Sequence, residues 1–521
     1  MMTRNQRAPR RLVWAGLFAL VAACGGPTAV EERGSVQLPG QARRVLTTAL
    51  DQIQDRYVRT VDVGALVESG LASVARVDTA LHMRRKGDML EIEGGGGDVA
   101  RVSTIAPGAA AWGNATVIAL EAGRARSATL RELSADATYK LFLDGVMKSL
   151  DSYSRYNSPE TAREERAQRE GFGGIGVTID TESGGVRIAN VMDDSPAARA
   201  GLMVDDRIVT IEGESTAGMT SRDVVRRLRG TAGAPVTIEV ARAATDHPLR
   251  VALVRAHIVP QTVAYRRVGD VAHIRISGFN PKTTESLVDA VRRAESEIGP
   301  RFAGIILDLR NNFGGYLDQS IYVSDLFLPE GSIVSTRGRH RALTQESFAR
   351  RGDIGEKIPL VVLINGNSAS ASEIVAAALQ DHNSAVVIGT NSFGKGSVQS
   401  ILTLPNEGEI VLTSARFHAP SGYALAELGV LPHLCTSGGR DSIPALLDQL
   451  RSGRFVDRAA AARWRSVGPD DAEGRRQLRS SACPADTADR ESDLELAKSI
   501  LADRNLHAAA LASTATLATA R

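Results

Sequence analysis

The sequence predicts a multidomain α/β protein, and three patterns along its 521 residues support this fold class. Residues 41–76 place apolar side chains at helical spacing. From Gly171 the chain changes to short strand-like runs separated by turns that contain glycine. Residues 258–435 then alternate strand-like and helix-like segments, which indicates a layered α/β domain. A chain of this length suffices for roughly two to four domains.

Composition argues against two classes of partner. The formal net charge is only +2, and no basic stripe with interleaved aromatic residues is present, so we expect no nucleic-acid partner. No His, Cys or carboxylate residues stand at the spacing of metal ligands. We therefore expect no metal and no other cofactor.

Residues 1–23 have the pattern of a bacterial lipoprotein signal peptide. Four arginines between positions 4 and 11 precede an apolar stretch over residues 12–23, which is too short for a comfortable membrane span. We predict cleavage before Cys24, lipidation of that cysteine and a linker over residues 24–40. An ordinary signal peptide with an incidental cysteine is the alternative. The prediction places the protein in the cell envelope, anchored by lipid to a membrane on its periplasmic face.

Export makes Cys435 and Cys483 a candidate pair, because disulfides form and persist in oxidising compartments. We hypothesise a disulfide that ties the C-terminal extension to the domain before it. Two free, buried thiols are the alternative.

A mostly helical N-terminal region is predicted over residues 41–167. Helical spacing covers residues 41–76 and returns over 136–168, while residues 77–135 form an insertion with short strand-like pieces. The charged stretch over 163–170 is interpreted as a solvated helix face or a hinge.

The remaining units follow in order. Residues 168–257 read as a small unit of strands with one helix, and its opening GFGGIG is no phosphate loop, because no Gly-Lys-Ser/Thr follows. In residues 258–435, helices are predicted over 282–298, 315–327 and 370–382, between the strands VAHIRIS, AGIILDL, LVVLIN and AVVIG. Residues 436–521 read as a helical extension.

Three alternating serines follow an apolar strand: Ser368, Ser370 and Ser372. The helix predicted from Glu373 makes helix capping the plain alternative for each of them, and the residue pattern does not choose among the three. Lys395 returns from an adjacent element, between two glycines. If Lys395 is buried, its pKa would be lowered enough for it to act as a general base. The alternative interpretation is an exposed lysine in a surface turn. A serine at a helix N-terminus beside a lysine suits acyl transfer.

The segment DLRNNFGG at 308–315 follows a buried strand and ends in Gly314 and Gly315. Backbone N–H groups at such a turn could stabilise an oxyanion, while a polar turn that needs glycine is the alternative. The histidines form no visible triad with an aspartate, His382 is expected to be exposed near its helix end, and no G-x-S-x-G motif is present.

From about Leu141 to Pro432 the chain resembles a carboxyl-terminal processing peptidase, a tail-specific serine endopeptidase with an inserted PDZ domain. The segments that carry the resemblance are LDSYSRYNSPE, GFGGIGV, SPAARAGLMVDDRIV, DLRNNFGG, SASASEI and GKGSVQ. The resemblance implies a PDZ domain at 168–257, a crotonase/ClpP-like α/β peptidase core at 258–435 and a helical extension at 436–521.

The same resemblance implies roles for individual residues. Ser370 would be the nucleophile, Lys395 the general base and Gln399 the orienting third member, with oxyanion donors at Ala371 and at Gly314 or Gly315. The PDZ domain would bind a free C-terminus by strand addition. The implied peptide-binding residues are Phe172, Gly173, Gly174, Ile175 and Gly176, together with Arg229, which is implied to couple ligand binding to the active site.

The chain departs from the family pattern at four places. Asp205 stands where a PDZ turn usually has glycine, Phe313 replaces a proline, and His433 stands in place of an aspartate. Residues 77–135 have no counterpart, and a substrate gate, a partner surface or a mere insertion are the open interpretations.

We therefore predict an exported serine endopeptidase that recognises protein C-termini through its PDZ domain and cleaves by a Ser/Lys acyl-enzyme mechanism. Its partners would be proteins or peptides with free C-termini, and a homo-oligomer or an adaptor protein is a further expectation. A catalytically silent PDZ scaffold and an acyl-CoA enzyme of related architecture are the rival predictions. A third possibility is a peptidase that stays latent until a peptide or adaptor fills the PDZ domain.

Overall fold

The computed structural model describes residues 40–104, 108–182, 185–350, 358–439, 442–452 and 458–518. The predicted signal peptide and lipidation site at Cys24 lie outside these ranges. Within them, none of the helices combines the length and apolarity that a membrane span requires.

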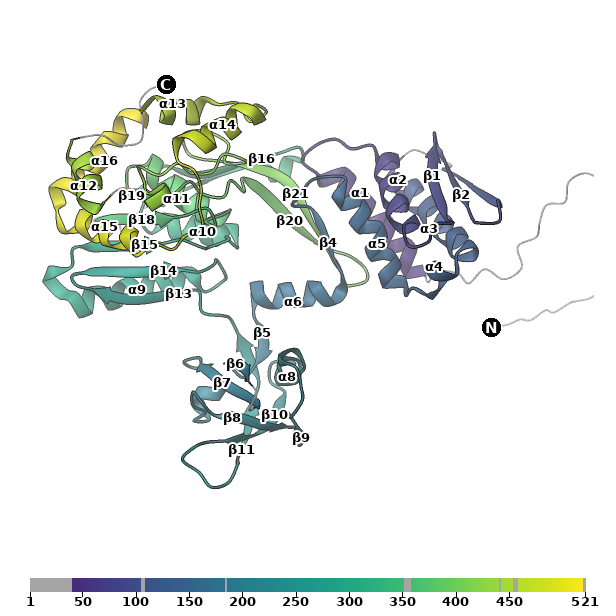
Figure 1. Ribbon diagram of the computed structural model, residues 1–521, viewed down its shortest axis with the longest axis horizontal. Coiled ribbons are helices and arrows are strands. Elements are labelled where there is room, and N and C mark those ends of the chain that lie inside the picture. Colours follow the sequence, from purple (N-terminus) through teal and green to yellow (C-terminus); the bar gives the residue numbers. More distant parts are fainter. Residues whose placement is uncertain are drawn as a thin grey trace, which may run out of the picture. The chain divides into compact units, whose positions relative to one another are not determined.

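The N-terminal region encloses an apolar core of its own, to which the predicted periodic residues Leu46, Leu50 and Ile53 contribute. The sequence analysis missed α3, because this helix is buried on several sides and so lacks a single apolar stripe. The strand-like pieces form an antiparallel three-stranded sheet beside the helices (Figure 1). The elements are α1 (Gly40–Arg56), α2 (Val63–Ala75), β1 (His82–Lys86), β2 (Met89–Glu93), β3 (Val99–Ser103), α3 (Ala109–Arg126), α4 (Ala128–Glu132) and α5 (Ala135–Lys148).

The helix predicted over 136–168 is interrupted. After α5, the carboxylate of Asp151 accepts two backbone N–H groups and turns the chain, and β4 (Arg155–Asn157) then pairs with strand β21 of the peptidase region. The helix α6 (Pro159–Glu170) begins at the capping residue Ser158.

A compact β-rich unit follows, with its own apolar core. Its main sheet has the order β11-β10-β8-β7-β6, and β5 pairs separately with β12. The elements are β5 (Phe172–Gly174), β6 (Val177–Glu182), β7 (Gly185–Val191), α7 (Pro196–Arg199), β8 (Arg207–Ile211), β9 (Glu214–Ser215), α8 (Ser221–Leu228), β10 (Pro235–Ala241), β11 (Leu249–Val254) and β12 (Ala256–Ile258).

The third region contains a six-stranded sheet in the order β13-β14-β15-β18-β19-β22, parallel from β14 onward. Alternate residues of its strands enter two cores: Val362 and Ile364 face one, while Val361 and Leu363 face the other. Burial on both faces explains the continuous apolar runs in the sequence. The elements are β13 (Val263–Val268), β14 (Val271–Ile276), α9 (Thr283–Ile298), β15 (Gly304–Asp308), α10 (Leu317–Asp325), β18 (Leu360–Ile364), α11 (Ala371–Asp381), β19 (Val386–Gly389) and β22 (Leu434–Cys435).

A second sheet, in the order β17-β16-β21-β20, stands beside the first and carries the segment after Lys395. Its strands are β16 (Ser332–Gly338), β17 (Gln345–Phe348), β20 (Ser397–Thr403) and β21 (Glu409–His418). The predicted C-terminal extension is helical, and α12, α15 and α16 cover one face of the six-stranded sheet (Figure 1). Its helices are α12 (Ile443–Arg451), α13 (Arg458–Ser466), α14 (Ala472–Ala482), α15 (Glu491–Ala502) and α16 (Arg504–Ala518).

Candidate active site

Ser370 differs from the two neighbouring serines in exposure and in backbone geometry. The hydroxyls of Ser368 and Ser372 are buried and donate to the carbonyls of Leu309 and Asn312, each at 2.8 Å. Ser370 is partly exposed and has a φ of 57°, in the left-handed region that costs a non-glycine residue about 1–3 kcal/mol. An ordinary N-cap serine has an extended backbone, so helix capping does not account for this geometry.

Lys395 lies in the turn between β19 and β20, where close backbone approach requires glycine on both sides. Gly394 has a φ of 86°, and a Cβ on Gly396 would lie only 1.9 Å from the backbone of a neighbouring loop. Burial lowers the pKa of Lys395, and the positive charge of Arg155 lowers it further. Its amine lies 5.8 Å from the ring centre of Tyr153, and it makes no hydrogen bond or ion pair with any residue that the structure describes.

One buried carboxylate holds the serine and lysine segments together. Glu373 is 0 % exposed and accepts the backbone N–H of Ser370 at 2.7 Å. The same side chain accepts the N–H of Lys395 at 3.0 Å, the N–H of Gly394 at 2.6 Å and the hydroxyl of Ser392 at 2.6 Å. Burial raises the pKa of Glu373, and the four donors directed at its oxygens oppose that rise. The sequence analysis treated Glu373 only as a helix residue.

The predicted residues Ser370, Lys395 and Gln399 lie in one region, but their side chains are not hydrogen-bonded to one another. Among the described residues, no hydrogen bond joins the Ser370 hydroxyl to the Lys395 amine. The side-chain amide of Gln399 donates to the carbonyl of Tyr153 at 2.6 Å and makes no contact of this kind with Lys395. Catalytic hydrogen bonds are often long in the absence of substrate and tighten when it binds.

The glycine pair after β15 lies against the serine turn. A Cβ on Gly314, whose φ is 98°, would lie 2.9 Å from Ser370 Cβ and 3.0 Å from the nitrogen of Ala371. The N–H of Gly314 donates to Asn312 Oδ1 at 2.9 Å. The N–H groups of Gly315 and Ala371 donate to no acceptor in the described parts of the chain. Of the two glycines left open by the sequence, Gly315 is thus the one with an available donor.

The structure pairs His273 with an aspartate, a pair that was not considered from the sequence. Its Nε2 lies 3.0 Å from Asp308 Oδ2, and both residues are buried on the adjacent strands β14 and β15. Burial disfavours the charged carboxylate, but hydrogen bonds from Arg310 and His273 lower the pKa of Asp308 overall. A separation of 35 residues on neighbouring strands leaves no local sequence signal for the pair.

The segment GFGGIG starts at the short strand β5. The carbonyl of Gly173 accepts the N–H of Gly230 at 3.0 Å, and the carbonyl of Ile175 accepts the N–H of Ala197 at 2.9 Å. Ile175 is 2 % exposed and belongs to the core of the unit, whereas Phe172 is partly exposed. Of the two implied peptide-binding residues in this segment that carry a side chain, only Phe172 is accessible.

Arg229 follows α8 and stacks on Phe172, with its guanidinium carbon 3.9 Å from the ring centre. Its Nε is buried and has no hydrogen-bond partner among the described residues. Burial lowers the pKa of this guanidinium. A desolvated cation with a vacant donor is suited to an incoming anion.

The departures from the family pattern have structural explanations. Asp205 adopts a φ of 73°, as a glycine at this turn would, and pairs with Arg187 at 2.8 Å. Phe313 is 64 % exposed. His433 is buried, its Nδ1 accepts the N–H of Val387 at 2.9 Å, and burial lowers its pKa to about 3.

Cys435 and Cys483 form a disulfide, with Cα atoms 5.8 Å apart.

The charged stretch over 163–170, interpreted above as a solvated face or hinge, also makes a buried contact. Arg166 and Arg169 of α6 pair with Glu409, whose side chain is only 2 % exposed.

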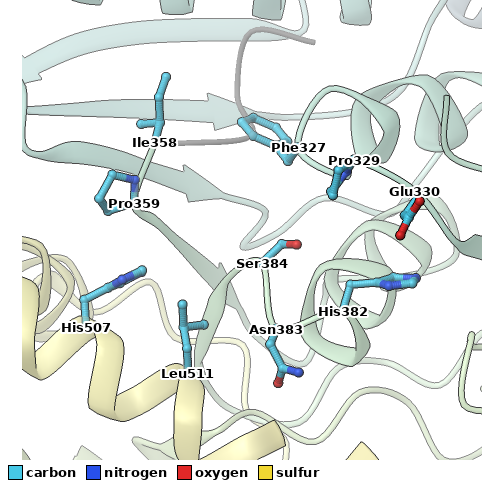
Figure 2. Close-up of a pocket in the computed structure, with 10 residues that line it drawn as sticks. All are labelled: Phe327, Pro329, Glu330, Ile358, Pro359, His382, Asn383, Ser384, His507 and Leu511. Carbon is cyan, nitrogen blue, oxygen red and sulfur yellow. The ribbon is translucent and has the colours of Figure 1, made fainter. Parts of the chain in front are cut away.

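A separate cavity of about 470 Å³ lies away from the serine turn (Figure 2). His382 lines it and is partly buried, with Nε2 2.6 Å from the carbonyl of Ser332, so the predicted exposure of this histidine was wrong. Neither Ser370 nor Lys395 lines the cavity. Across the described ranges, no cluster of three or more His, Cys, Asp or Glu residues could hold a metal ion.

Comparison with known proteins gives two family matches. The profile of peptidase family S41 matches residues 270–435, and a PDZ domain profile matches residues 187–242. A carboxy-terminal-processing protease of Bartonella bacilliformis is 42% identical over 294 residues, covering 56% of this chain and 68% of the relative. A carboxyl-terminal-processing protease of Synechocystis sp. is 36% identical over 264 residues, covering 50% of this chain and 61% of the relative.

Among solved structures, the photosystem II D1 C-terminal processing protease is 26% identical, with a TM-score of 0.35, over 59% of this chain and 85% of that one. The catalytically silent scaffold is not favoured, since the relatives are named as proteases. The extent and identity of the Bartonella match, together with the two profiles, establish that the chain belongs to the carboxy-terminal-processing protease family and is a serine endopeptidase with a PDZ domain.

Proposed function

We propose that Ser370 is the nucleophile of this endopeptidase and Lys395 its general base. The observation that carries the assignment is the contrast among the three serines. Only Ser370 combines partial exposure with a strained backbone, while the hydroxyls on either side are occupied by buried hydrogen bonds. The lowered pKa of Lys395 supports the second role, because a neutral amine is needed to accept the serine proton.

The reaction would run through an acyl-enzyme. The Lys395 amine takes the proton of the Ser370 hydroxyl as Oγ attacks the scissile carbonyl carbon, and the carbonyl oxygen becomes an oxyanion. N–H groups of Ala371 and Gly315 would stabilise that charge. The tetrahedral intermediate then expels the amine, which receives the proton from Lys395, and an ester to Ser370 remains. Water, deprotonated by the same lysine, hydrolyses the ester and regenerates the serine.

Gln399 is the proposed orienting member of the set. Its amide is bonded to Tyr153, a residue whose ring also faces the Lys395 amine. We propose that in the reacting complex the Lys395 amine contacts the Ser370 hydroxyl and Gln399 contacts the lysine. An adaptor or a peptide in the PDZ domain is proposed to promote this arrangement.

The PDZ domain is proposed to capture the free C-terminus of the substrate. The terminal carboxylate would bind at the N–H groups of the segment from Gly173 to Gly176, and the peptide would add as a strand. Arg229 supports this role, because its buried Nε has no hydrogen-bond partner among the described residues and its charge is desolvated beside Phe172. The substrate class is therefore proteins with accessible, unmodified C-termini.

We further propose that the protein is exported and held at a membrane through a lipid on Cys24, facing the periplasm. The pattern of residues 1–24 supports this, as does the disulfide between Cys435 and Cys483, which needs an oxidising compartment. An adaptor protein or a second copy of the chain is proposed as a regulatory partner. Incorporation of labelled fatty acid into wild type but not into Cys24→Ala would test the anchor.

The catalytic assignment is tested with an unfolded reporter that carries an apolar C-terminal tail. Wild type should cleave it, while Ser370→Ala and Lys395→Ala should each lose about 10³-fold or more in kcat. Ser480→Ala and Lys148→Ala are matched controls at exposed positions and should retain full activity. Equal cleavage by all variants would reject Ser370 as the nucleophile. If wild type binds the tail but does not cleave it, the rival prediction of a catalytically silent PDZ scaffold would be supported.

A further inference from the structure

One segment of the C-terminal extension that reaches the carboxyl ends of the central strands is residues 483–493, which we call the strap. Its first residue is tethered to Cys435 of β22 by the disulfide. Beyond it, the carbonyl of Asp486 accepts the N–H of Gly366 at 2.6 Å, and a second strap carbonyl lies 3.3 Å from the side-chain amide of Asn365. Both partners belong to the turn that precedes Ser370.

The strap also supplies acceptors for Arg310, at the start of the loop that carries the glycine pair. This guanidinium is 3 % exposed, so it needs partners on all sides. Asp489 pairs with Arg310 at 3.0 Å and with Arg275 at 2.8 Å. The carbonyl of Arg490 accepts a further N–H of Arg310 at 2.6 Å. Asp308 satisfies the other edge of the guanidinium.

Hydrogen bonds of the residues after Arg310, and one packing contact, lead towards the serine. The N–H of Asn311 donates to the side chain of Asn365 at 3.0 Å, and the side chain of Asn312 donates to the backbone of β14 at 2.7 Å. Asn312 Oδ1 in turn accepts the N–H of Gly314, whose Cα lies against Ser370. The strap thus holds both the loop of the glycine pair and the turn before the nucleophile.

We propose that the strap is a positioning element of the active site, which fixes the loop of residues 309–315 in the geometry that stabilises the oxyanion. This inference rests on the proposed role of Ser370. The peptidase profile ends at residue 435, so the strap lies outside the segment that this profile matches. Asp489 is its principal positioning residue, and the disulfide is its tether.

The test compares Asp489→Asn with wild type in the full chain. Because the oxyanion forms only during reaction, kcat should fall by about 10-fold to 10²-fold while KM changes little. Binding of a peptide aldehyde, which forms an oxyanion adduct, should weaken by the same factor. Asp489→Glu should recover part of the activity. Asp470→Asn, in the same extension and paired with Arg416 at 3.4 Å, is the matched control and should behave as wild type.

A second measurement does not depend on catalysis. Amide hydrogen exchange over residues 309–315 should be faster in Asp489→Asn and in the Cys435→Ser/Cys483→Ser double variant than in wild type, with the PDZ domain unchanged. Unchanged exchange in Asp489→Asn would overturn the strap proposal, whatever the activity. Faster exchange with full activity would also overturn it. If wild type never acylates Ser370 while exchange is still faster in Asp489→Asn, the proposed function is contradicted and the strap proposal is not.

Discussion

At the scale of the residue, the proposed general base is a lysine whose pKa is lowered by its surroundings. Burial and the nearby Arg155 lower the pKa of Lys395 from the usual 10.5, and the ring of Tyr153 limits its contact with water. Since only the neutral amine can accept a proton, the rate should depend on the fraction of Lys395 that is deprotonated.

The proposed role of Lys395 predicts that kcat/KM increases with pH. The fraction of neutral amine increases with pH, so kcat/KM should rise with the loss of one proton, with a midpoint below pH 10.5. Arg155→Ala removes a positive neighbour and should move the midpoint to higher pH. A profile that stays flat from pH 6 to 10 would argue against a titrating lysine.

Glu373 should couple stability to activity. In Glu373→Gln, an amide NH2 would face N–H donors that the carboxylate now accepts, and at least one donor would lose its partner. We expect a loss of ~2–4 kcal/mol in the free energy of unfolding and of about 10²-fold in kcat. Denaturant titration and steady-state kinetics measure the two effects. An active, fully stable variant would show that the two segments are held by other contacts.

At the scale of the element, α6 connects the PDZ domain to the second sheet. Its Arg166 and Arg169 share the buried carboxylate of Glu409, at 2.7 Å and 3.1 Å. Both arginines are partly exposed and can regain water. Glu409→Gln should therefore cost only about 1–2 kcal/mol in unfolding free energy, measured by denaturant titration. Glu407→Gln serves as the control. An equal loss of unfolding free energy in this control would show that the ion pairs of Glu409 have no specific stabilising role.

Elements with one clear signal were predictable from sequence, and those stabilised by distant contacts were not. The fully buried β18 reads as an apolar run, and α9 lies within a residue of its predicted bounds because one of its faces is apolar. The helix α11 also lies within a residue of its predicted bounds, although nearly all of its residues are buried. The helix α3 was missed because neighbours bury most of its surface. Likewise, SASASEI located the site but could not select Ser370, since the distinguishing hydrogen bonds of Ser368 and Ser372 come from residues about 60 positions earlier.

At the scale of the whole molecule, recognition and cleavage lie in different domains and should be separable. Arg229→Ala removes the cation proposed to meet the substrate carboxylate. It should raise KM for a tailed reporter about 10-fold, yet leave cleavage of a short peptide without a free C-terminus unchanged. Amidating the tail should raise KM for wild type in the same way and have no further effect on the variant. Equal losses on both substrates would mean that Arg229 supports the fold or the active site itself.

The central claim is that Ser370 is acylated with the help of Lys395. The most direct measurement is intact mass and peptide mapping after reaction with a peptidyl fluorophosphonate. The account predicts one adduct per chain, on Ser370, absent in Ser370→Ala and formed far more slowly in Lys395→Ala. An adduct on another residue, or labelling of Ser370 at an equal rate without Lys395, would contradict it.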